Sequence, residues 1–261
     1  MKKKIGVIVP DDGAFPLEII DEKAVNKWIS EETISNADYV SFLTPGDVSG
    51  LESSTEYDWC EYWAREDILV AAACHLGNAG CHSVVFGCTS ASSFKGMNHA
   101  RRLIQLLSES AGVPASSTSM AFLAALDLNG TKKVDILSVY SPDVTQRLIS
   151  FLAEAGIGVG NVRLVRCSPE ERAFNINCEA NLAEFVSLTT PSDDPILIPC
   201  TSIKSLNRIE SFERSSGRQV ITANQVTLWH ALVLAGFTPN IPGSFFKSFS
   251  YTADSALHLP L

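Results

Sequence analysis

The chain has 261 residues, of which 46% are hydrophobic and 19% are charged, a balance typical of a soluble globular protein with a large core. The net charge of −9 argues against a nucleic-acid partner, because phosphate binding needs clustered lysine and arginine. No segment is apolar over about 18 residues, so no membrane span is expected, and the apolar residues 5–9 are too few for a signal peptide. We therefore expect a cytoplasmic protein.

The first half of the sequence alternates short apolar runs with segments of helical character. Each run is bounded by glycine, proline or polar residues, as expected of buried parallel strands. We predict strands near residues 4–10, 39–43 and 83–87, and helices near residues 17–28, 56–76 and 94–107. The loop after the first strand, residues 11–16, lies where open α/β sheets bind ligands.

The same pattern restarts after a predicted helix at residues 116–128, because residues 132–143 repeat the character of residues 3–11. We predict further strands near residues 134–140, 162–166, 195–199 and 219–222, and further helices near residues 144–155, 177–188, 203–212 and 225–234. The glycine-rich residues 156–160 are interpreted as a helix stop. Trp229 and His230 are interpreted as packing residues, and residues 237–261 show no clear period.

Strands that alternate with helices predict an α/β fold with a mostly parallel sheet flanked by helices in each half. We therefore predict two similar lobes related by a pseudo-twofold axis, with the active site in the cleft between them. The first lobe comprises residues 1–114, to which the C-terminal segment 226–261 returns. The second lobe comprises residues 115–225.

A Cys-Thr-Ser motif occurs twice, at the end of a predicted strand in each half. It follows Gly87 as Cys88, Thr89 and Ser90, and it follows Pro199 as Cys200, Thr201 and Ser202. A cysteine on the turn from a strand into a helix lies near the positive end of the helix, which favours the thiolate. The neighbouring hydroxyls and the N–H groups of the turn can hold a carboxylate.

Two thiols that face one site suit a reaction with an acid on one side and a base on the other. Racemisation at an acidic carbon is one such reaction. Cis–trans isomerisation is another, in which a thiolate adds to an activated double bond and is eliminated after rotation. Neither reaction requires a metal or an organic cofactor, and we expect none.

The other cysteines indicate no disulfide framework and no metal site. The seven cysteines of the chain are an odd set without Cys-x-x-Cys spacing. The pairs Cys74-His75 and Cys81-His82 are separated by glycines that break any shared helical face. No bound metal is therefore expected.

Several segments resemble one known family. The two cysteine motifs, residues 5–10 (Ile-Gly-Val-Ile-Val-Pro), residues 139–142 (Val-Tyr-Ser-Pro) and residues 222–232 are similar to the maleate cis–trans isomerase and arylmalonate decarboxylase branch of the aspartate/glutamate racemase superfamily. The likeness extends from residue 4 to about residue 236. It implies two similar α/β lobes with the site between them, cofactor-independent activity, a small carboxylic-acid substrate and a homodimer or larger homo-oligomer.

The resemblance also implies roles for individual residues. Cys88 would be the first-lobe thiol and Cys200 the second-lobe thiol, although which acts as nucleophile or base and which as acid stays open. The substrate-binding residues would be Pro10, Thr89, Ser90, Tyr140, Asn177, Thr201 and Ser202. Asn177 matches a family asparagine near the start of a second-lobe helix, and Asn175 is also close.

The number of cysteines separates the members of the family. The decarboxylases keep only the second-lobe cysteine, so the presence of Cys88 predicts an isomerase or racemase, most similar to maleate cis–trans isomerase. The maleate isomerases carry an asparagine in the loop after the first strand, whereas residues 11–16 contain none. The alternatives are therefore an amino- or hydroxy-acid racemase, an arylmalonate-type decarboxylase, or a carboxylate-binding protein without activity.

Overall fold

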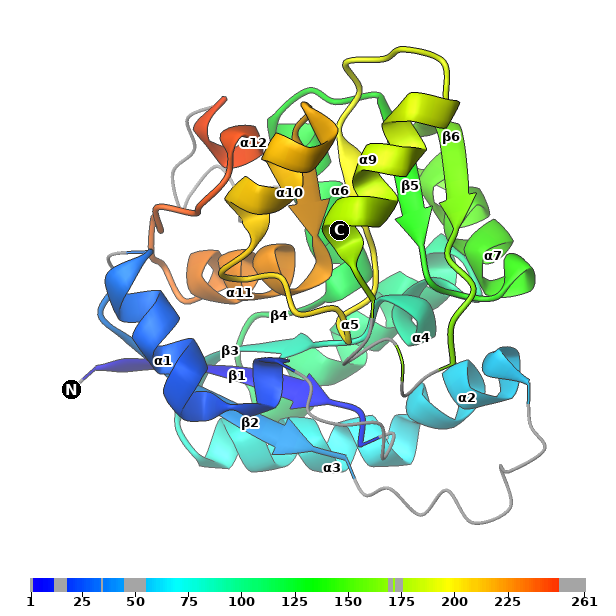
Figure 1. Ribbon diagram of the computed structural model, residues 1–261. Helices are drawn as coiled ribbons and strands as arrows, with labels where there is room; N and C mark the ends of the chain where they lie inside the picture. The colour runs from blue at the N-terminus through cyan, green and yellow to red at the C-terminus, as the bar shows by residue number, and fades with distance from the viewer. Residues whose placement is uncertain are drawn as a thin grey trace.

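The computed structural model describes residues 2–11, 18–33, 35–44, 55–168, 171 and 176–248 (Figure 1). Residues 12–16 of the first loop, Asn175 and the tail from residue 249 lie outside the described residues. None of the helices in these ranges has the length and apolar character that a membrane span requires.

The structure contains two four-stranded parallel sheets with the same strand order. The first has the order β2-β1-β3-β4, formed by β1 (Lys3–Val9), β2 (Ala37–Leu43), β3 (Cys81–Phe86) and β4 (Ala115–Ser117). The second has the order β6-β5-β7-β8, formed by β5 (Lys133–Ser138), β6 (Gly158–Leu164), β7 (Ile196–Ile198) and β8 (Val220–Thr222). The predicted α/β architecture of two similar units is confirmed.

Helices cover both faces of the first sheet. Helix α3 (Glu66–Asn78) packs on β1, β2 and β3, and α11 (Ala223–Leu234) packs on β1, β3 and β4. The remaining helical segments near this sheet are η1 (Glu18–Ile20), α1 (Glu22–Glu31), α2 (Glu56–Trp63), α4 (Thr89–Ser93), α5 (Met97–Ala111) and α6 (Thr118–Leu128). With both faces covered, the strands are apolar runs, and Ile5, Val7, Ile8 and Val9 of β1 are fully buried.

The second sheet is flanked by α7 (Pro142–Glu154), α9 (Cys178–Leu188) and α10 (Ile209–Ser216) (Figure 1). Helix α12 (Ser244–Lys247) lies beside β8, whereas α11, which precedes it, packs chiefly on the first sheet. The C-terminal part of the described chain therefore contacts both sheets. The lobe boundaries inferred from the sequence stay a prediction.

Several predicted elements differ from the structure. Residues 115–117 form the edge strand β4, although Ala-Ser-Ser has little intrinsic strand preference and a helix was expected from residue 116. The helix expected at residues 56–76 is two helices, because Arg65 has extended backbone between α2 and α3. Gly156 ends α7 with φ of +74°, as predicted, but Gly158 and Gly160 are part of β6.

Candidate active site

The two candidate cysteines occupy equivalent positions in the two sheets. Cys88 is the second residue after β3, and Cys200 is the second residue after β7. Strands β3 and β7 hold the same place in their sheets, next to β1 and β5 respectively. Each thiol therefore lies at the carboxyl end of a central parallel strand, where α/β folds place their ligands.

Cys88 is held in a tightly packed turn. It is the N-cap residue of α4 with an extended backbone, and its side chain is 9% exposed. The preceding Gly87 has no room for a side chain, because a Cβ there would lie 2.9 Å from Val7 Cγ1 and 3.1 Å from Ile19 Cδ1. The Cys88 Sγ lies 3.7 Å from the Ser90 hydroxyl.

A buried serine of α4 holds the Cys88 turn through a hydrogen bond to its backbone. The Ser92 hydroxyl lies 2.6 Å from the Cys88 carbonyl oxygen and 2.8 Å from the Ser119 hydroxyl of α6. Both serines are fully buried. These contacts tie α4, which carries Thr89 and Ser90, to the neighbouring helix α6.

Thr89 is the polar group of this turn that is left without a protein partner. Its side chain is 1% exposed, and its hydroxyl makes no hydrogen bond within the part of the chain that the structure describes. A buried hydroxyl without a partner is energetically unfavourable. It is therefore suited to bind a ligand group next to Cys88.

Cys200 has a different local backbone. The Ile203 N–H donates to the Cys200 carbonyl oxygen at 3.2 Å, and residues 201–208 form turns before α10 begins at Ile209. The helix predicted near residues 203–212 is therefore α10 (Ile209–Ser216), and Cys200 does not lie on a turn that leads straight into it. Thr201 and Ser202 are both buried in this turn.

Cys178 lies near Cys200, and Cys167 in turn lies near Cys178. Burial raises the pKa of Cys178 to about 12, and the Cys200 and Cys167 thiols add to that rise. Cys178 therefore stays a neutral thiol at physiological pH. It is the first residue of α9 and was not among the predicted site residues.

Tyr140 joins the Cys200 turn. Its hydroxyl donates to the Pro199 carbonyl oxygen at 2.9 Å, directly before Cys200. Its backbone N–H donates to the Ser138 hydroxyl at 3.2 Å. The structure thus brings Tyr140 and Cys200 together, as the resemblance implies for two residues of one site.

Two side chains of α2 and a backbone carbonyl at the end of α4 contact the segment after Tyr140. The Ser141 N–H donates to the Glu56 carboxylate at 2.6 Å. The Arg147 guanidinium of α7 lies 4.4 Å from the Tyr57 ring centroid and donates to the Phe94 carbonyl oxygen at 3.4 Å. The Cys88 turn and the start of α7 are therefore packed together, since α4 contacts both α2 and α7.

The other two predicted substrate-binding residues have structural surroundings of their own. Asn177 is exposed, and its Oδ1 caps α9 by accepting from the Ala180 N–H at 3.0 Å. Pro10 is buried and directly follows β1. Their roles towards a substrate stay predictions.

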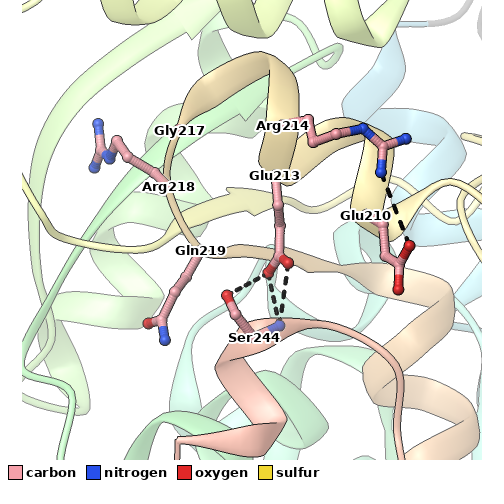
Figure 2. A pocket seen from close by; sticks show the side chains of 7 residues that line it. All are labelled: Glu210, Glu213, Arg214, Gly217, Arg218, Gln219 and Ser244. Atoms are coloured by element: carbon pink, nitrogen blue, oxygen red, sulfur yellow. Dashed lines mark hydrogen bonds and ion pairs between the residues drawn. The ribbon is translucent and has the colours of Figure 1, made fainter.

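A surface hollow of about 550 Å³ lies elsewhere, between α10 and α12 (Figure 2). It contains none of the predicted site residues and is lined by Glu210, Glu213, Arg214, Gly217, Arg218, Gln219 and Ser244. The Glu213 carboxylate accepts from the Ser244 N–H at 2.9 Å and from its hydroxyl at 2.7 Å, and Arg214 pairs with Glu210. Arg218 pairs with Asp135, which does not line the hollow. Because each of these charged groups already has a partner, the hollow offers no clear ligand site.

Comparisons with known proteins show which family the chain resembles. The family model described as arylmalonate decarboxylase matches residues 50–245, which include both cysteine motifs. Arylmalonate decarboxylase of Bordetella bronchiseptica is 28% identical over 177 residues, which cover 67% of this chain and 74% of that protein. Maleate isomerase of Pseudomonas putida is 23% identical over 179 residues, 66% of this chain and 71% of that protein.

A solved structure shows the same fold. The crystal structure of the maleate isomerase Iso from Pseudomonas putida S16 matches with a TM-score of 0.77 and 20% identity, over 94% of this chain and 98% of that one. The matches in sequence and in structure thus extend over most of the chain. The protein belongs to the arylmalonate decarboxylase family.

Proposed function

We propose that the protein is a cofactor-independent isomerase of a small dicarboxylic acid, similar to maleate cis–trans isomerase. The observation that carries this proposal is the pair of thiols at equivalent positions, Cys88 after β3 and Cys200 after β7. A decarboxylase needs one thiol to protonate its product, whereas an isomerase or racemase uses one on each side of the substrate.

For a cis-dicarboxylate such as maleate, the chemistry follows from the two thiols. One thiolate attacks an alkene carbon, a C–S bond forms, and the π-electron pair moves to the other carbon and into its carboxylate. The molecule then rotates about the remaining single bond. Return of the electron pair restores the double bond, breaks the C–S bond and releases the trans isomer with the thiolate regenerated. The second thiol can give a proton to the carbanion and take it back.

Hydroxyl groups at the two turns suit the carboxylates of such a substrate. The unpartnered hydroxyl of Thr89 can donate to one oxygen, and Ser90 lies beside the Cys88 thiol. Tyr140 lies at the other turn, where its hydroxyl now donates to the Pro199 carbonyl oxygen. Donors fixed in a buried site stabilise negative charge that develops on a carboxylate.

A second candidate function is decarboxylation of a substituted malonate. The family model and the 28% identical relative favour it. In this reaction a carboxylate leaves as CO₂, its bonding electrons remain on the α-carbon, and a thiol supplies the proton that completes the product. One cysteine is sufficient for decarboxylation, so Cys88 is required only if the protein is an isomerase or racemase.

Proton NMR in deuterated water distinguishes the candidates. Maleate, aspartate, glutamate, small 2-hydroxy acids and phenylmalonate are each incubated with the native chain, with Cys88→Ala and with Cys200→Ala. The control is Cys74→Ala, which changes a half-buried cysteine of α3. Fumarate formed from maleate and lost only in the two site variants supports the isomerase, and deuterium at a chiral centre with the same losses supports a racemase.

Other outcomes reject the isomerase proposal. Loss of CO₂ from phenylmalonate that needs Cys200 but not Cys88 assigns the chain to the decarboxylases. If no compound reacts and neither thiol is alkylated by iodoacetamide near neutral pH, the protein is a binding protein without activity.

A further inference from the structure

The short helix η1 contacts both cysteine turns. The carboxylate of Glu18 accepts hydrogen bonds from the Ser205 N–H at 2.8 Å, the Leu206 N–H at 3.1 Å and the Asn224 side-chain amide at 2.9 Å. Ser205 and Leu206 follow Cys200, and Asn224 lies at the start of α11. The half-buried Glu18 carboxylate therefore links η1 to the start of α11 and to the segment that follows Cys200.

A continuous chain of hydrogen bonds leads from Glu18 to Cys200. The Asn224 amide that donates to Glu18 also donates to the Ile203 carbonyl oxygen at 3.1 Å. The Ile203 N–H in turn donates to the Cys200 carbonyl oxygen at 3.2 Å. The chain passes through the Asn224 amide and the backbone of Ile203. A displacement of the Glu18 carboxylate is therefore transmitted to the Cys200 turn.

A second contact supports the same segment. The indole N–H of Trp28, in α1, donates to the Leu206 carbonyl oxygen at 3.2 Å, and both atoms are buried. In Figure 1 the segment that precedes α10 accordingly passes close to α1. The segment after Cys200 is thus held at Ser205 and Leu206 by two neighbouring elements, η1 and α1.

The next residue of η1 packs against the other cysteine turn. Ile19 is fully buried, and its Cδ1 lies so close to Gly87 that a Cβ there would be 3.1 Å away. The hydroxyl of Tyr39 in β2 donates to the Ile19 carbonyl oxygen at 2.5 Å, which fixes η1 to the first sheet. Adjacent residues of one turn of helix therefore touch the Cys88 turn and the Cys200 turn.

We propose that Glu18 is a positioning residue that sets the place of Cys200 relative to Cys88. This inference rests on the proposed function, because only a reaction that uses both thiols needs their separation to be fixed. A carboxylate suits the task, since hydrogen bonds to an ionised acceptor are shorter and stronger than neutral ones. Glu18 itself does not touch the reacting atoms.

The reaction is sensitive to this placement. A displacement of about 1 Å in a catalytic group can lower the rate about 100-fold. The hydroxyls proposed to bind the substrate belong to Thr89, Ser90 and Tyr140, none of which bonds to Glu18. Loss of the Glu18 carboxylate should therefore lower kcat far more than it changes KM.

The test compares Glu18→Ala and Glu18→Gln with Glu213→Ala. Glu213 is a matched control, because its carboxylate also accepts from a backbone N–H and a second donor, both of Ser244. It lines the hollow of Figure 2, whose lining residues do not belong to either cysteine turn. The first readout needs no substrate. It is the iodoacetamide alkylation rate of each cysteine, followed by mass spectrometry, together with amide hydrogen exchange of residues 203–206.

In Glu18→Ala we expect Cys200 to react about tenfold faster, equivalent to about 1.4 kcal/mol of lost restraint, and the amides of Ser205 and Leu206 to exchange faster. Cys88 should change less than about twofold, because its own restraints from Ser92 remain. Glu18→Gln keeps one acceptor oxygen, so its Cys200 alkylation rate should lie between those of the native chain and Glu18→Ala. Glu213→Ala should leave the reactivity of both cysteines as in the native chain.

The kinetic readout uses whichever compound the native chain converts, and there Glu18→Ala should lower kcat about 100-fold with KM within a few-fold. Unchanged Cys200 alkylation and amide exchange in both folded Glu18 variants would overturn the proposal, as would equal effects of Glu213→Ala. If Glu18→Ala does not fold, Glu18→Gln and Trp28→Phe decide the same question. If no compound is converted, the proposed function fails, whereas the alkylation and exchange data still decide whether Glu18 positions the turn.

Discussion

The buried hydroxyl of Thr89, which has no hydrogen-bond partner among the described residues, shows that a single residue can affect substrate binding and stability differently. Leaving a buried polar group unsatisfied costs about 1–3 kcal/mol, so a folded protein that keeps one gives up stability. Thr89 lies beside Cys88, and a substrate oxygen is the partner that would satisfy it. Stability and substrate binding should therefore respond in opposite directions when this hydroxyl is removed.

The substitution Thr89→Val replaces the hydroxyl with a methyl group of similar size. We expect the free energy of unfolding to stay the same or rise by about 1 kcal/mol, and KM to rise about tenfold, since the buried hydroxyl has no hydrogen-bond partner among the described residues. Urea unfolding and steady-state kinetics on the converted compound measure the two effects.

A suitable comparison is Thr118→Val. The Thr118 hydroxyl is equally buried but lies 2.7 Å from the Thr227 hydroxyl, so its removal should lower stability and leave KM unchanged. A loss of stability in Thr89→Val as large as that in Thr118→Val would show that Thr89 has a structural partner.

Residues differ in how well the sequence reveals them. The catalytic role of Cys88 and Cys200 stays a prediction, but their equivalent positions at two strand ends could be predicted, because a repeated motif at the end of a repeated strand is unlike chance packing. Glu18 could not, since a glutamate in a segment of helical character resembles an ordinary solvated residue. Its hydrogen-bond partner Ser205 is 187 positions away, a contact that only the folded chain creates.

At the scale of elements, the strands with an apolar run were predictable and those without one were not. β1 contains an apolar run at residues 5–9 and β3 one at residues 84–86, whereas β4 is Ala-Ser-Ser and is recognisable only from its pairing with β3. One helix break was also missed. The break at Gly96, with φ of +82°, separates α4 from α5 within a segment of otherwise helical character.

The second sheet contains a buried ion pair that could not be predicted from the sequence. Asp135 in β5 is fully buried and pairs with Arg218 at 2.9 Å, and it also accepts from the Asn161 N–H of β6 at 2.6 Å. Arg218 further donates to the Asp194 carbonyl oxygen. The pair joins β5, β6 and the turn that leads into β8, so it ties together three parts of the second sheet.

The substitution Asp135→Asn should lower the free energy of unfolding by about 3–5 kcal/mol, because it leaves the Arg218 charge buried without a counter-ion. Urea unfolding followed by circular dichroism measures this. Asp67→Asn is the control, since Asp67 pairs with Arg65 on the surface with its side chain 66% exposed, and such pairs contribute at most about 1 kcal/mol. Similar losses in both variants would contradict a special role for the buried pair.

At the scale of the whole molecule, α11 connects the two sheets. It packs on β1, β3 and β4 of the first sheet and also contacts β8 of the second, and all its residues are buried. The sequence predicted this helix and its packing role for Trp229 and His230. It also predicted that the segment from residue 226 returns to the first lobe, but it could not show which strands the helix covers, because that depends on how the folded elements pack.

His230 makes the stability of this arrangement depend on pH. Its ring is fully buried against Trp229, its Nδ1 lies 3.0 Å from the Ser116 hydroxyl, and burial lowers its pKa to about 4. In the unfolded chain the pKa returns to about 6.5, so between these values the unfolded state binds a proton that the folded state does not. The His230 contribution to stability is therefore complete above about pH 6.5 and is lost as the pH falls towards 4.

Within that range, the free energy of unfolding of the native chain should fall by about 1.4 kcal/mol for each pH unit through His230 alone. His99, whose pKa is also lowered by burial, acts in the same direction and is present in both proteins to be compared. The substitution His230→Gln should flatten the dependence by that amount, even if it lowers stability at neutral pH. Urea unfolding at several pH values between 4.5 and 7 measures both slopes, and parallel slopes would mean that His230 is charged in the folded protein or stays neutral in the unfolded one.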